Sequence, residues 1–276
     1  MILDGRALAK EVLARAKARA ELLPHPPRVL ALVANETPAT KSYLAIKAKR
    51  AADAGCILEV RQFPESVSAE ELQSVITQSD ADAIIVQLPL PSGIDTKEVC
   101  DTIPIEKDAD ILSSASRTQS EMMDIRCPSL LPPVVGAVQK ILEFGKVKTK
   151  GKKVVIIGAG FLVGAPAALW LTRQGAHVTV LTRTSEDFTA ARSAADIIIS
   201  GAGSPHLIKP DMIKEGVVLI DAGTSESGGA LAGDADPACA AKCSLFTPVP
   251  GGVGPLAVAC LFENVVTLAE RAMNIK

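Results

Sequence analysis

A tyrosine and a lysine four residues apart are the first pair in this chain with the chemistry of a catalytic site. Tyr43 is the single tyrosine of the 276 residues, and Lys47 follows it on the same face of a helix predicted over residues 37–54. An amine that is partly removed from water loses its proton more readily, which makes it a base near neutral pH. Other basic residues flank Lys47, so the alternative interpretation is a solvated basic face.

A polar amide follows the apolar run 83–86. Gln87 begins the sequence Gln-Leu-Pro-Leu-Pro, whose prolines hold the backbone extended. The carboxyl end of a buried parallel strand is where α/β sheets bind ligands, so Gln87 is a candidate ligand-binding residue. The alternative is an amide that merely satisfies the strand end.

Two acids straddle one residue in Lys107-Asp108-Ala109-Asp110. Such a pair can cap a helix, bind a metal ion or accept hydrogen bonds from the ring N–H groups of a ligand, and capping is the default. The three histidines are scattered and the six cysteines show no zinc-like pairing. We therefore expect no metal site and no histidine-based triad.

A strand, a glycine turn and a helix follow one another at residues 153–166. Gly158, Gly160 and Gly164 lie between a β-branched run and an Ala/Leu-rich stretch, an order suited to binding a pyrophosphate at a helix N-terminus. The third glycine comes one residue later than in Gly-x-Gly-x-x-Gly. The alternative is a tight turn that binds no ligand.

Three prolines and three glycines crowd the nine residues 247–255, Thr-Pro-Val-Pro-Gly-Gly-Val-Gly-Pro. These residue types impose a fixed, close-fitting loop, and a helix is predicted to start directly after it. A ligand can meet backbone donors there, as at the glycine turn.

The order of elements predicts an α/β protein with two αβα domains, parallel sheets, a Rossmann-like C-terminal domain and an active-site cleft between the two. We expect residues 1–133 and 255–276 to form a catalytic domain and residues 134–254 a dinucleotide-binding domain, with an irregular crossing at 104–133. The predicted helices are 5–23, 37–54, 69–78, 96–102, 134–144 and 255–273. The predicted strands are 28–34, 57–62, 83–86, 153–157, 177–181, 197–200, 217–220 and 245–247.

Composition narrows the class of protein. Hydrophobic residues make up 48% and aromatic residues 3%, which indicates an aliphatic core, and the net charge is −2. Without a basic stripe or charged tail, we expect no nucleic-acid or membrane partner. No uninterrupted apolar run is long enough to span a bilayer, and the N-terminus does not have the features of a signal peptide. We expect reduced cysteines and a cytoplasmic location.

Taken in order, the five motifs resemble those of the bifunctional methylenetetrahydrofolate dehydrogenase/methenyltetrahydrofolate cyclohydrolase family, often called FolD. The sequences Ile220-Asp221-Ala222-Gly223 and Gly233-Asp234-Ala235-Asp236 also match that family. The resemblance implies oxidation of 5,10-methylenetetrahydrofolate to the methenyl form with NADP, then hydrolysis to 10-formyltetrahydrofolate. It also implies one-carbon tetrahydrofolate derivatives as partners and a homodimer formed through the second domain.

The resemblance also assigns roles to residues of this chain. It implies that Lys47 is the base of the cyclohydrolase step, that Tyr43 packs on the folate, and that Gln87 bonds both Lys47 and the folate. The implied catalytic residues are Lys47, Gln87, Tyr43 and Asp110, and these four also bind substrate together with Gly251, Gly252 and Pro255. The implied cofactor-binding residues are Gly158, Ala159, Gly160, Gly164, Arg183, Gly203 and Thr224.

Several positions depart from the family pattern. The sequence Leu-Pro-Pro-Val-Val-Gly at 131–136 replaces Pro-Cys-Thr-Pro-x-Gly, Ile111 replaces a glycine, and Ala257 replaces a threonine. Gly160 stands where many relatives have serine. Arg183 follows the strand 177–181, where a 2′-phosphate would lie, so the sequence favours NADP over NAD, with NAD as the alternative.

Four other functions are alternatives at this point. Short-chain dehydrogenases also use Tyr-x-x-x-Lys, but after an N-terminal glycine turn, and enzymes of the shikimate dehydrogenase type would not explain Gln-Leu-Pro-Leu-Pro. A monofunctional NAD(P)-dependent methylenetetrahydrofolate dehydrogenase is a narrower alternative, which the retained Lys47 and Gln87 disfavour. A non-catalytic nucleotide-binding relative is the alternative of another class.

Overall fold

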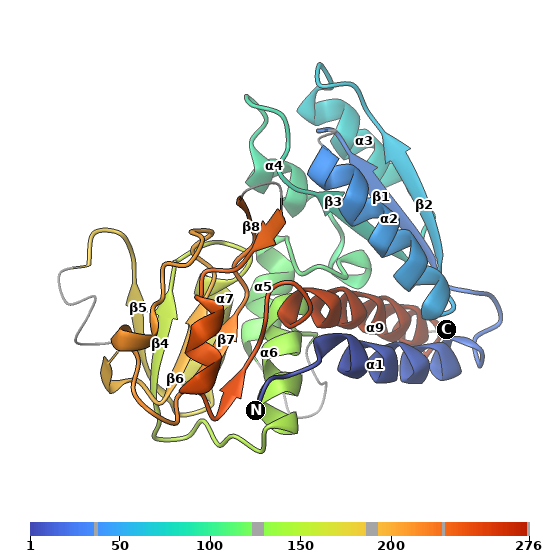
Figure 1. The fold of residues 1–276 in the computed structure, drawn as a ribbon. Coiled ribbons are helices and arrows are strands. Elements are labelled where there is room, and N and C mark those ends of the chain that lie inside the picture. Colours follow the sequence, from blue (N-terminus) through green and yellow to red (C-terminus); the bar gives the residue numbers. More distant parts are fainter. Residues whose placement is uncertain (36–37, 123–129, 186–192, 228–229, 275–276) are drawn as a thin grey trace. The chain divides into compact units, whose positions relative to one another are not determined.

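The computed structural model describes the whole chain except residues 36–37, 123–129, 186–192, 228–229 and 275–276 (Figure 1). The chain divides into two compact units, and each is described by itself. The lysine unit comprises residues 10–133 and 258–276, and the glycine-turn unit comprises residues 1–9 and 134–257. Three helices have residues in both units: α1 (Gly5–Ala20), α9 (Val253–Asn274) and α6 (Pro133–Phe144), of which α6 has only Pro133 in the lysine unit.

The lysine unit is built on a three-stranded parallel sheet. Its strands are β1 (Arg28–Val33), β2 (Ile57–Gln62) and β3 (Ala83–Gln87), in the order β2-β1-β3. In register, Val33 lies opposite Gln87, so β1 and β3 end at the same edge of the sheet. The other elements of this unit are α2 (Pro38–Asp53), α3 (Ala69–Gln78), α4 (Thr96–Asp101), the short 3-10 helix η1 (Ile105–Lys107) and α5 (Ser114–Met122).

Alternation along the strands decides which way Gln87 points. Leu30 and Leu32 of β1 and Ile84 and Val86 of β3 share one apolar cluster with residues of α3 and α4. Successive side chains of a strand point to opposite faces, so Gln87 lies on the face opposite to that cluster. The sheet therefore presents an amide at its carboxyl edge, next to a fully buried interior.

The glycine-turn unit contains a five-stranded parallel sheet in the order β10-β7-β6-β4-β5. The chain order reverses between β4 and β6, which makes that point the switch point at which open α/β sheets bind ligands. The strands are β4 (Lys153–Ile157), β5 (His177–Leu181), β6 (Ile197–Ser200), β7 (Val218–Asp221) and β10 (Leu245–Phe246), with helices α6 (Pro133–Phe144) and α7 (Gly164–Arg173). A two-stranded hairpin, β8 (Ser225–Ser227) and β9 (Ala230–Ala232), and the 3-10 helices η2 (Pro210–Met212) and η3 (Pro237–Ala241) complete it.

The first residues of the chain extend this second sheet. Ile2 pairs in parallel with Phe246, and the Leu3 N–H donates to the Phe246 carbonyl at 2.9 Å. Pairing across more than 240 residues leaves no local pattern in the sequence. It explains why residues 1–9 belong to the glycine-turn unit.

By length and composition alone, the helix α9 is long and apolar enough to cross a membrane. Within the described residues, 72% of the apolar stretch of this helix, in Val253–Met273, is buried inside the protein. Glu263 and Asn264 interrupt its apolar character, and Asn264 donates hydrogen bonds to backbone carbonyls. This burial is typical of a core helix.

The predicted α/β class with parallel sheets is confirmed in both units. The prediction of an irregular segment at 104–133 is wrong in its first part, because η1 and α5 form there. The hairpin β8–β9 was not predicted either. The predicted domain boundaries and the cleft between domains stay predictions.

Candidate functional site

The side chains of Lys47 and Gln87 form a direct hydrogen bond. Lys47 Nζ donates to Gln87 Oε1 at 2.9 Å, and Gln87 Nε2 donates to the Leu88 carbonyl at 2.9 Å. The second bond fixes the amide so that its oxygen faces the amine. Lys47 is only 6% exposed, although lysine is among the residues least often buried. The pair therefore holds an amine at the carboxyl edge of the sheet and away from bulk water.

Asp110 reaches the same edge by a different route. Asp108 pairs in parallel with Ile84 of β3, so the chain at 108–110 runs alongside β3 toward its carboxyl end. Asp110 is half-buried. Its charge acts on Lys47 through space, which shows that the structure brings these two residues into one site with Gln87.

Burial shifts both titrating groups of this site. It lowers the pKa of Lys47 below the ordinary lysine value, and the negative charge of Asp110 partly opposes that change. Burial also raises the pKa of Asp110, which the charge of Lys47 opposes and that of Asp108 reinforces. A neutral amine is consequently easier to form here than on a solvated helix.

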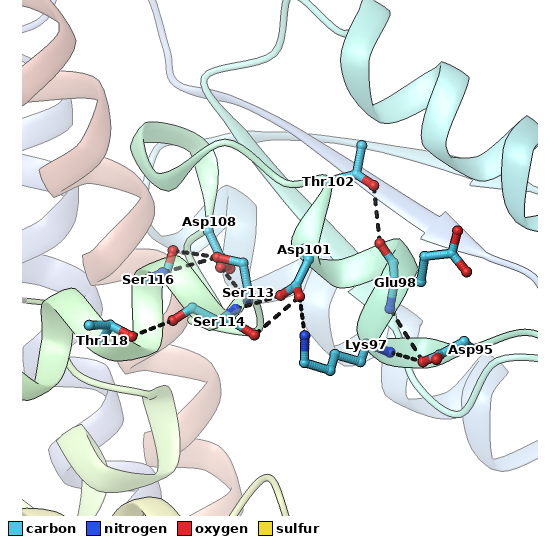
Figure 2. Close-up of polar contacts among 10 residues, drawn as sticks. All are labelled: Asp95, Lys97, Glu98, Asp101, Thr102, Asp108, Ser113, Ser114, Ser116 and Thr118. Carbon is cyan, nitrogen blue, oxygen red and sulfur yellow. Dashed lines mark hydrogen bonds and ion pairs between the residues drawn. The ribbon is translucent and has the colours of Figure 1, made fainter.

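Asp108 organises the loop that carries Asp110. It is fully buried and accepts hydrogen bonds from the N–H groups of Leu112 at 3.0 Å and Ser113 at 2.8 Å. Ser114 starts α5, and its N–H donates to the Asp101 carboxylate at 2.6 Å. Figure 2 shows the two aspartates with Ser113 and Ser114 between them. Asp108 thus orders the loop before α5, whereas the cap of α5 is Ser113, whose Oγ accepts from the Ser116 N–H at 3.1 Å, so the default expectation that this acidic motif caps a helix is not met by Asp108.

The backbone next to Asp110 is unusual. Ile111 has φ 55 and a buried side chain, although a β-branched residue rarely adopts the left-handed conformation. Asn264 of α9 donates to the carbonyls of Ala109 and Leu131, each at 2.9 Å. Contacts on both sides of Asp110 therefore fix a turn that a glycine would form without strain.

The glycine turn fits a dinucleotide. Gly158 has φ 95, and a Cβ on Gly164 would lie 1.9 Å from the Gly158 carbonyl oxygen, so α7 starts in direct contact with the turn. A Cβ on Gly160 would meet nothing within 4 Å, so this position faces open space in front of the N-terminus of α7. A close helix start with free space before it is what a pyrophosphate needs.

Other predicted cofactor residues lie in loops at the carboxyl edge of the same sheet. Arg183 is exposed two residues after β5, between Thr182 and Ser185, and the Thr182 N–H donates to Ser185 Oγ at 2.9 Å. Gly203 follows β6 and has φ 63, and Thr224 follows β7 and is exposed. These residues, with Ala159 in the glycine turn, are grouped within one unit as predicted for a nucleotide site.

The remaining predicted substrate residues are placed as follows. Gly251, Gly252 and Pro255 belong to the glycine-turn unit, where Gly251 has φ 111 and a Cβ on it would lie 2.8 Å from Arg6 Nη1. Tyr43 lies on α2, one turn before Lys47, and its side chain is outside the described part of the structure.

Two contributors were missed because their role depends on the tertiary fold. Asn264 lies within the helix predicted over residues 255–273 and had no role assigned, and Asp108 was named only as one of two acids suited to capping, metal binding or ligand binding. A polar residue in an otherwise apolar helical pattern, as at Asn264, is the signal that would have identified it. No such signal separates Asp108 from Asp110.

Two family models match most of the chain. The model described as tetrahydrofolate dehydrogenase/cyclohydrolase, catalytic domain, matches residues 3–110, and the one described as its NAD(P)-binding domain matches residues 132–273. The first match contains Lys47, Gln87 and Asp110, and the second contains the glycine turn.

Full-length relatives agree with these matches. A bifunctional protein FolD of Moorella thermoacetica is 38% identical over 279 residues, covering 98% of this chain and 99% of that protein. One of Nitrosospira multiformis is 36% identical over 281 residues, covering 98% and 96%. A crystal structure of FolD from Campylobacter jejuni has a TM-score of 0.94 at 32% identity, covering 99% of both chains. A FolD of Trypanosoma brucei, complexed with NADP cofactor and inhibitor, has a TM-score of 0.93 at 32% identity, covering 99% and 98%.

The pH dependence of stability tests the burial of Lys47. Because its pKa is lowered in the folded protein, the unfolded chain binds the additional proton between that pKa and the ordinary value of 10.5. Lys47 therefore makes the free energy of unfolding rise with pH in this window. We expect Lys47→Met to gain stability relative to the parent protein at pH 7 and to lose that advantage as the pH approaches 10, measured by urea unfolding.

Differences in packing and the lost hydrogen bond to Gln87 also change the free energy of unfolding of the variant. They change it by a similar amount at every pH, so they do not reproduce the pH-dependent trend. Lys49→Met, at an exposed position of the same helix, is the matched control. A stability difference between Lys47→Met and parent that stays constant from pH 7 to 10 would contradict the burial of a titrating amine.

Proposed function

The chain belongs to the tetrahydrofolate dehydrogenase/cyclohydrolase family, and we propose that Lys47, Gln87 and Asp110 form its folate site. The enzyme oxidises 5,10-methylenetetrahydrofolate with NADP to the methenyl cation and hydrolyses this product to 10-formyltetrahydrofolate. The observation that carries the proposal is the buried amine of Lys47, bonded to an uncharged amide and electrostatically coupled to one carboxylate.

The cyclohydrolase step requires a group that takes up a proton and returns it. Water adds to the methenyl carbon, and neutral Lys47 takes the proton from that water. The carbon–N5 bond then breaks, the resulting ammonium of Lys47 protonates N5, and the adduct's hydroxyl loses its proton to solvent as it becomes the formyl carbonyl on N10, so that one proton is released overall. One amine suffices for both transfers when its pKa is lowered toward neutrality, as burial does for Lys47.

The dehydrogenase step needs orientation more than proton transfer. When bound, NADP supplies a nicotinamide ring that accepts the hydride from the one-carbon bridge. Asp110 would accept hydrogen bonds from the pterin edge, and Gln87 would hold both Lys47 and the folate. Gly251, Gly252 and Pro255 would border the folate and nicotinamide, and Tyr43 would pack on the folate.

Several features disfavour the narrower alternatives. A monofunctional dehydrogenase has no use for a buried base, yet Lys47 and Gln87 are retained and bonded. A non-catalytic relative would not need to bury an amine at an energetic cost. Ala257 removes a hydroxyl and Gly160 removes another, changes that reduce side-chain donors without touching Lys47.

Lys47→Met tests the proposed base directly. We expect kcat of the cyclohydrolase to fall about 10²- to 10⁴-fold, the usual contribution of a general acid–base group. The affinity for NADP should change less than twofold. The decay of methenyltetrahydrofolate absorbance measures the first quantity, and calorimetric titration with NADP measures the second.

Lys49→Met serves again as the matched control and should hydrolyse the methenyl substrate at the parent rate. The assignment of the base is wrong if folded Lys47→Met retains the parent rate as well. Absence of turnover by the parent enzyme, with both NADP and NAD, would contradict the enzymatic function itself.

We further propose that Arg183 recognises the 2′-phosphate of NADP. Its guanidinium is exposed beyond the end of β5, at the strand edge where the ribose of a dinucleotide lies, and the hydroxyls of Thr182 and Ser185 are beside it. Arginine binds phosphate through paired N–H donors, and no acid ends β5 to bind a free 2′-hydroxyl.

Arg183→Ser should therefore change cofactor preference. Loss of a charged hydrogen bond costs about 1.5–3 kcal/mol, so we expect kcat/KM for NADP to fall about tenfold or more. The value for NAD should stay within twofold of the parent. Initial rates of methenyltetrahydrofolate formation with each cofactor measure both, and an equal loss with NADP and NAD would show that Arg183 does not read the phosphate.

A cytoplasmic homodimer completes the proposal. Five cysteines are described, all buried and none in a disulfide, which suits a reducing compartment. The edge strand β5 exposes Val180, an apolar residue that a second copy can cover. Light scattering of the purified protein should give about twice the chain mass of 28.7 kDa, and a monomer mass at micromolar concentration would contradict the dimer.

A further inference from the structure

Two buried aspartates of the glycine-turn unit have no part in the chemistry described above. Asp221 is the last residue of β7, and Asp234 follows β9. They are 1% and 0% exposed, and Asp234 lies in the sequence Gly-Asp-Ala-Asp. Because β7 ends at the carboxyl edge of the parallel sheet, both carboxylates belong to the edge at which a dinucleotide binds.

Asp234 fixes the loop that follows β6. Its Oδ2 accepts hydrogen bonds from Ser200 Oγ at 2.6 Å and from the Ala202 N–H at 2.7 Å, and its Oδ1 accepts from the Ser204 N–H at 2.7 Å. These three donors surround Gly203, which has φ 63. One carboxylate thus sets the path of the whole turn from the end of β6 to Ser204.

Asp221 fixes the loop that follows β7. Its Oδ1 accepts from the Gly223 N–H at 2.9 Å, and its Oδ2 accepts from the Ala235 N–H at 2.8 Å. The Asp221 N–H donates to Thr247 Oγ1 at 2.7 Å, at the start of the loop 247–255. Asp221 consequently connects three segments that are remote from one another in the sequence.

The two aspartates interlock through glycines. A Cβ on Gly223 would lie 2.2 Å from the carboxyl carbon of Asp234, and a Cβ on Gly233 would lie 2.2 Å from Asp221 Oδ2. Each carboxylate therefore packs on a glycine next to the other aspartate's segment. No other residue type fits at either glycine, so the arrangement is a fixed unit of four residues.

Burying these two carboxylates costs free energy of folding, so the fold by itself gives no reason to keep them. In the part of the chain that the structure describes, no lysine, arginine or histidine bonds either carboxylate. Burial raises the pKa of Asp221 to about 6, an effect that the backbone N–H groups of Ala235, Gly223 and Asp234 oppose and the charge of Asp234 reinforces. A buried carboxylate without a cation is retained where its acceptors are needed to order backbone donors.

We propose that Asp221 and Asp234 are positioning residues for NADP, which hold the loops after β6 and β7 in the conformation that binds the cofactor. Gly203 and Thr224, the predicted cofactor contacts in those loops, are the residues through which they act. An amide in place of Asp234 keeps one acceptor but turns an NH₂ group toward an N–H or O–H donor.

Asp234→Asn tests the proposal, with Asp236→Asn as the matched control in the same motif. Asp236 accepts from the Ala238 N–H at the start of η3 and from Lys209, and its side-chain hydrogen bonds reach neither residues 201–204 nor residues 222–224. We expect the Kd for NADP, measured by calorimetric titration of the enzyme, to rise at least tenfold for Asp234→Asn and less than twofold for Asp236→Asn. The cyclohydrolase rate requires no NADP and should stay within twofold of the parent in both variants.

The kinetic constants of the dehydrogenase reaction distinguish a positioning role of Asp234 from a purely structural one. We expect KM for NADP to rise with Kd while kcat at saturating NADP changes less than threefold. An unchanged Kd in folded Asp234→Asn overturns the proposal, as does a parallel fall of cyclohydrolase and dehydrogenase rates. Should Asp234→Asn fail to fold, Ser200→Ala decides: it removes one donor to Asp234 Oδ2, and a Kd raised at least threefold supports the proposal while an unchanged Kd overturns it.

Discussion

Burial of the Lys47 amine is the constraint on which the catalytic site depends. Lys47 donates to an uncharged amide at 2.9 Å, which orders the amine without stabilising its positive charge as a carboxylate would. Asp110 supplies a charge that opposes the effect of burial without cancelling it. The balance leaves the pKa of Lys47 lowered, which is the direction that proton transfer near neutral pH requires of the proposed base.

The surrounding elements maintain that balance from outside the reacting group. Gln87 points toward Lys47 because it lies an odd number of residues after both Ile84 and Val86, and therefore on the opposite face of the sheet from those two. Asp110 is held by its neighbours rather than by its own bonds, since Asp108 and Asn264 fix the chain on either side of it. These contacts hold Ile111 in the left-handed conformation. They compensate for its backbone strain, and a solvent-exposed loop would lack them.

The sequence predicts those parts of the structure whose cause is local. The bounds of β2, β4, β5 and β6 match the predicted ranges, because runs rich in β-branched residues between turns favour strands, whether buried as in β4 and β6 or mostly exposed at a sheet edge as in β2 and β5. Helix α5 was missed because residues 114–122 have no apolar periodicity, and its start depends on the Asp101 carboxylate from α4. Lys47 and Gln87 were identified from motifs, whereas their bond joins residues 40 positions apart and required the fold.

The two units bury charge in opposite ways, and the difference follows from what each must do. The proposed base, Lys47, has to change its protonation state during the reaction, which suits its bond to a neutral amide and its lowered pKa. The carboxylates of Asp221 and Asp234 face N–H and O–H donors instead, and Asp234 alone accepts three bonds between 2.6 and 2.7 Å. Short bonds from several backbone donors favour one geometry over all others. A reacting group would be immobilised by such a network, but a loop that has to match a rigid dinucleotide benefits from it.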